Sequence, residues 1–192
     1  MGTYEIQIHG HILQIRVVEC AALVITGLAE LRPLIRSKRP VGLAVKFRHN
    51  RPNGKPTMLQ LCVGTRCLVI LLNQLDEIPR VLKDFLADQE ICFVGVDMRK
   101  GLSAMERYYG IECTSSIEVS ELGARILRKP KLCGSDLVVL ANKVGISLEE
   151  SPSFDSFNWG GKVFSDKEIK YAIRDVYASY LIGSKLLASL FL

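Results

Sequence analysis

The feature that most limits the fold of this chain is a long helix predicted for its C-terminal part. Ser165 and Glu168 have the spacing of a capping box, in which each side chain accepts a hydrogen bond from the backbone amide of the other residue. From 166 to 191, apolar residues recur at helical spacing without an internal proline. Such a helix needs a hydrophobic layer on which to pack.

Strand patterns earlier in the chain predict that layer. We expect a first hairpin that turns at Gly10, a single strand, a second hairpin that turns at Gly64, and a nearly continuous apolar run typical of a buried parallel strand. The predicted strands are 3–8, 12–18, 41–47, 58–63, 67–72 and 91–96, antiparallel through the second hairpin. The predicted helices before the last one are 28–36, 79–87, 102–109, 119–127 and 135–144. This order predicts one α/β domain, 1–192, with a mixed sheet flanked by helices.

Composition limits the surroundings of the protein. The six cysteines form no Cys-x-x-Cys pair and lie mostly in apolar segments, which favours reduced core thiols over a zinc site. No apolar run reaches the length of a membrane span, and the first ten residues alternate as a strand does. We therefore expect no membrane association and a cytoplasmic, or else nuclear, location.

Positive residues are clustered although the net charge is only +5. Three clusters fall in predicted loops and helix ends, and such clusters neutralise backbone phosphates. They are Lys46, Arg48, Arg51 and Lys55; Arg99 and Lys100; and Arg125, Arg128, Lys129 and Lys131. Each alone is compatible with a solvated face, but together they favour a nucleic-acid partner.

Tyr171 and Asp175 are four residues apart in the predicted C-terminal helix. This spacing places a phenol and a carboxylate on one helical face, where both can act on one small target such as a metal-bound nucleophile. A surface tyrosine beside a solvated acid has the same spacing, so the pair alone does not decide between these interpretations.

The order of elements resembles the ribonuclease H-like fold of DnaQ-like 3′-5′ exonucleases, and the plant Werner-exonuclease-like subgroup in particular. The most specific agreement is with the tyrosine-bearing class, in which a Tyr-x-x-x-Asp helix follows a loop with tryptophan. Here these are Tyr171, Asp175 and Trp159. Weaker agreement covers 41–43, 57–63 and 93–96.

The resemblance implies a catalytic role for the tyrosine and the acids. Four carboxylates would hold two divalent metals, Mg²⁺ or Mn²⁺, with Asp175 as one ligand and Tyr171 orienting or deprotonating the water. Asp97, at the end of a predicted strand, is the nearest acid to the second motif and the candidate for a replacement ligand. The residues expected to bind substrate are Lys46, Arg48, Arg99, Lys100 and Trp159.

The first two motifs of this family are altered here. Ala44 and Lys46 occupy the positions where the resemblance predicts two carboxylates, and Lys100 or Gly101 occupies the position of a third. Three explanations are open: an engineered substitution at Ala44, a rebuilt site that uses Asp97, Lys46 or a neighbouring subunit, or a catalytically inactive domain. Asp97 has a structural alternative as the cap of the next helix.

Within this subgroup, the pattern looks like the RISC-interacting clearing 3′-5′ exoribonucleases. That resemblance implies a single-stranded RNA substrate, a homohexamer, and a role in RNA silencing beside Argonaute, clearing fragments of small-RNA-guided cleavage. The first hypothesis is therefore an exoribonuclease. A second is a nucleic-acid-binding or scaffold protein without hydrolysis, and a third is a protein-interaction module whose basic loops are merely solvated.

Overall fold

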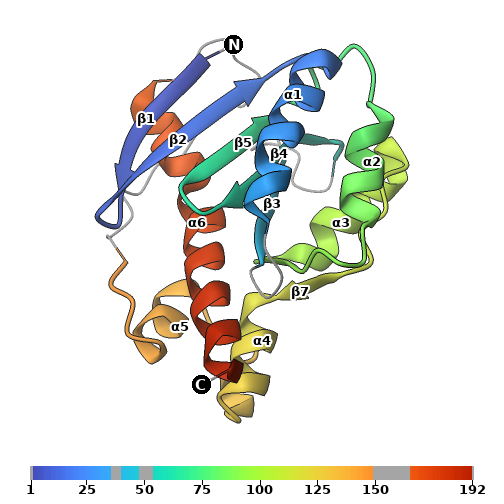
Figure 1. Ribbon diagram of the computed structural model, residues 1–192. Helices are drawn as coiled ribbons and strands as arrows, with labels where there is room; N and C mark the ends of the chain where they lie inside the picture. The colour runs from blue at the N-terminus through green and yellow to red at the C-terminus, as the bar shows by residue number, and fades with distance from the viewer. Residues whose placement is uncertain (1, 36–39, 48–53, 149–164, 192) are drawn as a thin grey trace.

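A computed structural model describes residues 2–35, 40–47, 54–148 and 165–191 of the chain, which form one mixed sheet with helices on both faces (Figure 1). The strands lie in the order β1-β2-β5-β4-β3-β6-β7. They are β1 (Gly2–Ile8), β2 (His11–Val18), β3 (Val41–Phe47), β4 (Pro56–Val63), β5 (Arg66–Ile70), β6 (Phe93–Gly95) and β7 (Ser116–Glu118). The predicted α/β fold class is confirmed.

The six α-helices of the described residues occur in the predicted order, but several begin at other residues than predicted. They are α1 (Ala21–Leu31), α2 (Arg80–Ala87), α3 (Met98–Tyr109), α4 (Val119–Ile126), α5 (Leu137–Lys143) and α6 (Asp166–Ala188), with short 3₁₀ turns at Arg32–Leu34, Pro130–Leu132 and Ser189–Phe191. No helix in the described ranges combines the length and the apolar character that a membrane crossing requires.

Two predictions about the elements were wrong. The pairing of β2 with β5 is parallel, so the sheet is not wholly antiparallel through the second hairpin. The first helix begins at Ala21, not near position 28, because its N-terminal amide donates to a carboxylate far along the chain: Ala21 N lies 2.9 Å from Asp76 Oδ1. Cys20 occupies the N-cap position but makes no side-chain cap hydrogen bond, so no local capping residue marked the start of this helix in the sequence.

The capping box predicted for the last helix is present. Ser165 Oγ accepts a hydrogen bond from Glu168 N at 3.3 Å, and Glu168 Oε2 accepts one from Ser165 N at 2.8 Å. The predicted free thiols are also found, although Cys133 is exposed and does not belong to the core.

Two hydrophobic layers enclose the sheet. The α6 face contributes a cluster that includes Ala44, Val69 and Tyr177, whereas the opposite face packs residues such as Leu43 and Leu61 beneath α1, α2 and α3. Figure 1 shows α1 and α2 in front of the strands and the long red α6 behind them. The alternation of side chains along β3 therefore decides which residues face α6 and which face α3.

Gly42 allows α6 to lie directly against β3. A Cβ atom at this position would come within 2.6 Å of the carbonyl oxygen of Val176 and 3.0 Å of the Cβ of Tyr180. The close approach is therefore between backbones, and the α6 turn that carries Asp175 is held beside the end of β3.

We expect Gly42→Ala to lower the melting temperature by about 5–10 °C, because the helix must shift and overpacking costs about 1–3 kcal/mol in a chain of this size. Gly123→Ala in α4 is the matched control, since its Cβ would meet only the ends of two side chains, Leu140 at 3.1 Å and Leu186 at 3.7 Å. Thermal unfolding followed by circular dichroism measures both. Equal melting temperatures for the two variants would contradict the close approach.

Candidate functional site

Lys46 and Asp175 meet at the end of β3, where α6 crosses it. Lys46 Nζ lies 3.3 Å from Asp175 Oδ2, and each side chain is about one quarter exposed, at 25% and 26%. Lys46 reaches α6 because it points to the same face of β3 as Ala44, which packs in the α6 layer. The structure thus joins a residue predicted to bind substrate to the predicted metal ligand.

Arg174 holds the other oxygen of the same carboxylate. Its Nη2 and Nε atoms donate to Asp175 Oδ1 at 2.9 and 3.2 Å. Burial raises the pKa of Asp175. The charges and hydrogen bonds of Lys46 and Arg174 together lower this pKa by more than burial raises it, so it lies below its usual value. The carboxylate is therefore ionised at neutral pH, and its contribution to stability is lost only as the pH falls through the depressed pKa.

Tyr171 lies one turn before Asp175 on α6. Its ring is partly buried and packs against the α6 layer of the core. The helix therefore presents the phenol and the carboxylate at the spacing that the sequence predicted. Their catalytic roles remain predictions.

The positions of the expected first and second motifs hold no carboxylate. Ala44 is only 4% exposed and belongs to the apolar α6 layer. Gly101 is buried in α3 against the sheet, and a Cβ at this position would lie 2.8 Å from the Cβ of Val45. The close packing of α3 on β3 therefore leaves no room for an acidic side chain at Gly101.

Asp97 follows β6 and is exposed at the N-cap position of α3, with a positive φ of 53°. It makes no cap hydrogen bond there; instead Glu118 Oε1 accepts from Met98 N. Burial raises the pKa of Glu118 above its usual value, and the charges of Asp97 and Glu121 act in the same direction. Hydrogen bonds from the Met98 and Arg99 amides lower this pKa, but by less. Asp97 thus lies beside Glu118, whereas the ionic partners of Asp175 are Lys46 and Arg174. Its assignment as a metal ligand remains a prediction.

The other predicted contacts have different outcomes. Arg99 and Lys100 are exposed on α3 and line an open pocket of about 600 Å³ together with Asp97 and Glu118. Arg48 and Trp159 lie outside the described residues. Sequence reasoning missed Arg174, because neighbouring helix residues do not normally share a face and an Arg-Asp dipeptide gives no signal of its own.

The described residues do not by themselves fit a site for two divalent metals. Among them, no three His, Cys, Asp or Glu side chains are grouped so as to hold a metal ion. Both oxygens of Asp175 already accept hydrogen bonds from cations. A hard divalent ion prefers several oxygen ligands, and here the ammonium of Lys46 stands in the position of one of those ligands.

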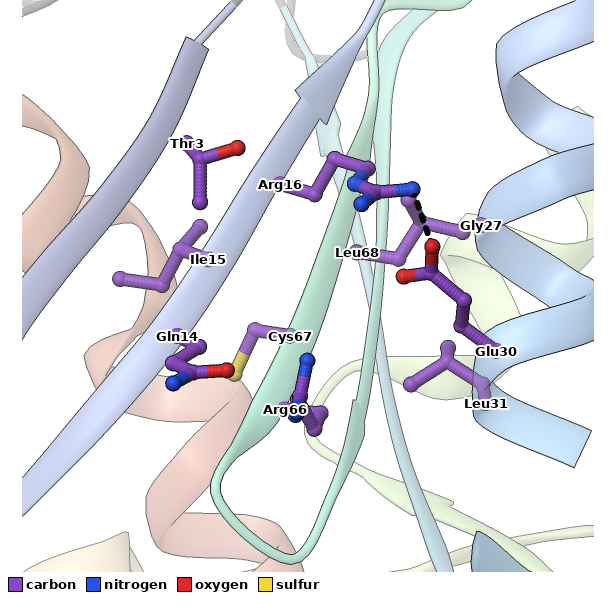
Figure 2. A pocket seen from close by; sticks show the side chains of 10 residues that line it. All are labelled: Thr3, Gln14, Ile15, Arg16, Gly27, Glu30, Leu31, Arg66, Cys67 and Leu68. Carbon is purple, nitrogen blue, oxygen red and sulfur yellow. Dashed lines mark hydrogen bonds and ion pairs between the residues drawn. The ribbon is translucent and has the colours of Figure 1, made fainter. Parts of the chain in front are cut away.

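A smaller cavity lies elsewhere, between β2, β5 and α1 (Figure 2). Its volume is about 40 Å³, room for little more than ordered water. Arg16 at its rim is paired with Glu30 at 2.7 Å. Its size makes it unsuitable for a nucleotide.

Comparison with known proteins decides what the α6 and β3 arrangement represents. The family model described as 3′-5′ exonuclease matches residues 28–190, which include both Lys46 and Asp175. The chain belongs to the 3′-5′ exonuclease family. Membership supports the assignment of the chain to the exonuclease hydrolases.

Curated relatives of this exonuclease domain are longer proteins. Human exonuclease 3′-5′ domain-containing protein 2 is 27% identical over 172 residues, which cover 88% of this chain and 24% of the relative. The Drosophila melanogaster protein of the same name is 23% identical over 150 residues, covering 78% of this chain and 23% of the relative. The chain therefore spans about a quarter of the length of these relatives.

Solved structures agree with the exonuclease fold. The EXD2 exonuclease domain soaked in Mn and Mg has a TM-score of 0.55 and 24% identity, and the alignment covers 91% of this chain and 89% of that one. The same domain soaked in Mg and GMP has a TM-score of 0.55 and 23% identity, with 91% and 88% covered. These similarities confirm the ribonuclease H-like fold, and the Mn and Mg soaks belong to the EXD2 domain.

Proposed function

We propose that this domain binds single-stranded RNA and removes nucleotides from its 3′ end, as a 3′-5′ exoribonuclease of its family. The observation that carries the proposal is the position of Tyr171 and Asp175 on the turn of α6 that packs against the end of β3. Lys46 and Arg174 add positive charge beside that turn, which favours the approach of a phosphate.

The finer parts of the proposal rest on the sequence resemblance alone. They are a cytoplasmic role in RNA silencing, clearance of small-RNA-guided cleavage fragments beside Argonaute, and a homohexamer. EXD2 structures soaked with GMP and with dGMP both exist, so the choice of RNA over DNA also belongs to the proposal.

A second candidate function is RNA binding without hydrolysis. The observation that favours it is the 3.3 Å pair between Lys46 and Asp175, together with the absence of a carboxylate at Ala44 and Gly101. A fixed ammonium would balance the charge of Asp175 without a metal. This candidate predicts RNA binding that weakens with salt but persists in EDTA.

One assay separates the two candidates. Single-stranded RNA labelled at its 5′ end is incubated with the protein in Mg²⁺, in Mn²⁺ and in EDTA, and both products and complexes are resolved on gels. Ladders that shorten from the 3′ end only in the presence of metal are the result expected for the exoribonuclease. Stable complexes in all three conditions, without products, would assign the second function. If no complex formed even at low salt, both would be wrong.

A further inference from the structure

A pocket on the other side of β3 from Asp175 has the chemistry of a nucleobase site. It lies between the end of β3 and the exposed face of α3, and its volume is about 230 Å³. Its lining residues are Phe47, Lys100, Ser103, Ala104, Arg107 and Tyr108. The five α3 residues recur at spacings of three and four, so they lie along one face of that helix.

Two aromatic rings line this pocket and remain accessible. Tyr108 is 42% exposed and Phe47 is half-buried. The neighbouring Tyr109 serves the fold instead, because its hydroxyl donates to the carbonyl oxygen of Pro56 at 2.6 Å. Packing of α3 on the sheet therefore does not account for the exposed ring of Tyr108.

Cations flank these rings. Lys100 Nζ lies 5.6 Å from the centre of the Phe47 ring, and Arg107 is exposed in the last turn of α3. Within the part of the chain that the structure describes, none of the residues lining the pocket is acidic. Aromatic faces with cations beside them bind single-stranded nucleic acid, since bases stack on the rings and phosphates are neutralised by the cations.

The end of β3 links this pocket to the Lys46–Asp175 pair. The pairing of β3 with β4 shifts register between Lys46 and Phe47, and successive residues of a strand point to opposite faces of the sheet. Lys46 then contacts α6, whereas Phe47 contacts Lys100 of α3. Lys46 and Phe47 are consecutive residues at the end of β3, so an RNA that lies across this end of the strand would meet both groups.

We propose that Phe47, Tyr108, Lys100 and Arg107 form a stacking site for one base of a single-stranded RNA that also contacts Lys46. The inference rests on the proposed RNA binding and adds a subsite to it. A protein partner with acidic side chains could use the same cations, but the placement of both rings beside cations in one pocket favours a base with its phosphate.

The test compares binding of two RNAs to the full chain in EDTA, so that hydrolysis does not interfere. One is a 12-nucleotide oligoadenylate, and the other has the same backbone with abasic sites throughout; anisotropy gives both affinities. Tyr108→Ala is expected to weaken binding of the oligoadenylate about tenfold, within the range for loss of one stacked base. It should leave binding of the abasic strand within about twofold, because no base is present to lose.

Matched variants complete the test. Tyr108→Phe should retain affinity because it keeps the ring, and Val138→Ala, an exposed apolar residue of α5, should have no effect. Lys100→Gln and Arg107→Gln should weaken both strands alike. Melting temperatures show that each variant is folded.

Three results would overturn the stacking site. They are normal oligoadenylate binding by Tyr108→Ala, equal weakening of both RNAs by that variant, and equal affinity of the wild-type protein for the abasic strand and the oligoadenylate. By contrast, a wild-type protein that bound neither RNA at low salt would refute the proposed function itself.

Discussion

Lys46→Glu is expected to give the domain a stronger stabilisation by Mn²⁺ than the wild-type protein shows. In the variant, two carboxylates would face each other between β3 and α6, at the place where Lys46 Nζ now lies 3.3 Å from Asp175 Oδ2. Without metal, the lost ion pair and the new repulsion should cost about 1–2 kcal/mol, which lowers the melting temperature by about 3–8 °C. Mn²⁺ at about 100 times its dissociation constant should raise the free energy of unfolding of the variant by about 2.7 kcal/mol.

The controls for this prediction separate charge from coordination. Lys46→Gln removes the ion pair without adding an oxygen anion, so it should lose some stability and gain no response to Mn²⁺. Asp175→Asn in the Lys46→Glu background should abolish the response, because one of the two carboxylates is gone. Differential scanning fluorimetry with and without Mn²⁺ measures all four proteins. A wild-type protein stabilised by Mn²⁺ as strongly as Lys46→Glu would show that Lys46 does not stand in place of a metal ligand, and would favour the hydrolytic candidate.

Strand and helix patterns predicted the parts of the fold that local signals determine. β3 has the predicted bounds because six apolar or small residues and Lys46 follow Pro40 and end before a basic stretch of sequence. α6 begins where the capping box placed it. The short strand β7 was missed because three half-buried residues show no readable alternation. The parallel pairing of β2 with β5 was missed because nothing local in either strand identifies its neighbour.

The candidate site was only partly readable from the sequence. Ala44, Lys46 and Gly101 could be recognised as departures from the family pattern, because the resemblance fixes the positions at which carboxylates are expected. The ion pair between Lys46 and Asp175 could not be predicted, because the two residues are 129 positions apart in the sequence and only the packing of α6 on β3 brings them together. The exposed face of α3 did carry a signal, because Lys100, Arg107 and Tyr108 recur at helical spacing.

The position of Asp97 shows why a strand-end acid is ambiguous. Both interpretations of its sequence position, as a helix cap and as a replacement ligand, required a partner that the sequence could not identify. In the fold, Glu118 of β7 accepts the hydrogen bond at the start of α3, and the charge of Asp97 acts on Glu118. A neighbouring strand has thus taken the role that local sequence would give to Asp97.

Tyr171→Phe and Asp175→Asn are expected to reduce degradation of single-stranded RNA from the 3′ end by about 10²- to 10⁴-fold, the range for loss of a positioned acid–base group. Tyr171→Phe removes one hydroxyl and keeps the ring that packs on the α6 layer. Asp175→Asn keeps the shape of the side chain but removes the charge that Lys46 and Arg174 balance, so a lower melting temperature accompanies the loss of rate. Asp166→Asn, an exposed change at the start of the same helix, is the control and should retain full activity.

The measured quantities are the single-turnover rate on labelled RNA with saturating protein and the affinity for the same RNA in EDTA. A true loss of chemistry lowers the rate of both variants while leaving the affinity within about threefold, because neither removes a cation that binds phosphate. Rates equal to that of Asp166→Asn would mean that the α6 pair has no part in hydrolysis even if the protein degrades RNA. The exonuclease fold would then bind its substrate through Lys46 and the α3 face, and any hydrolysis would depend on groups other than Tyr171 and Asp175.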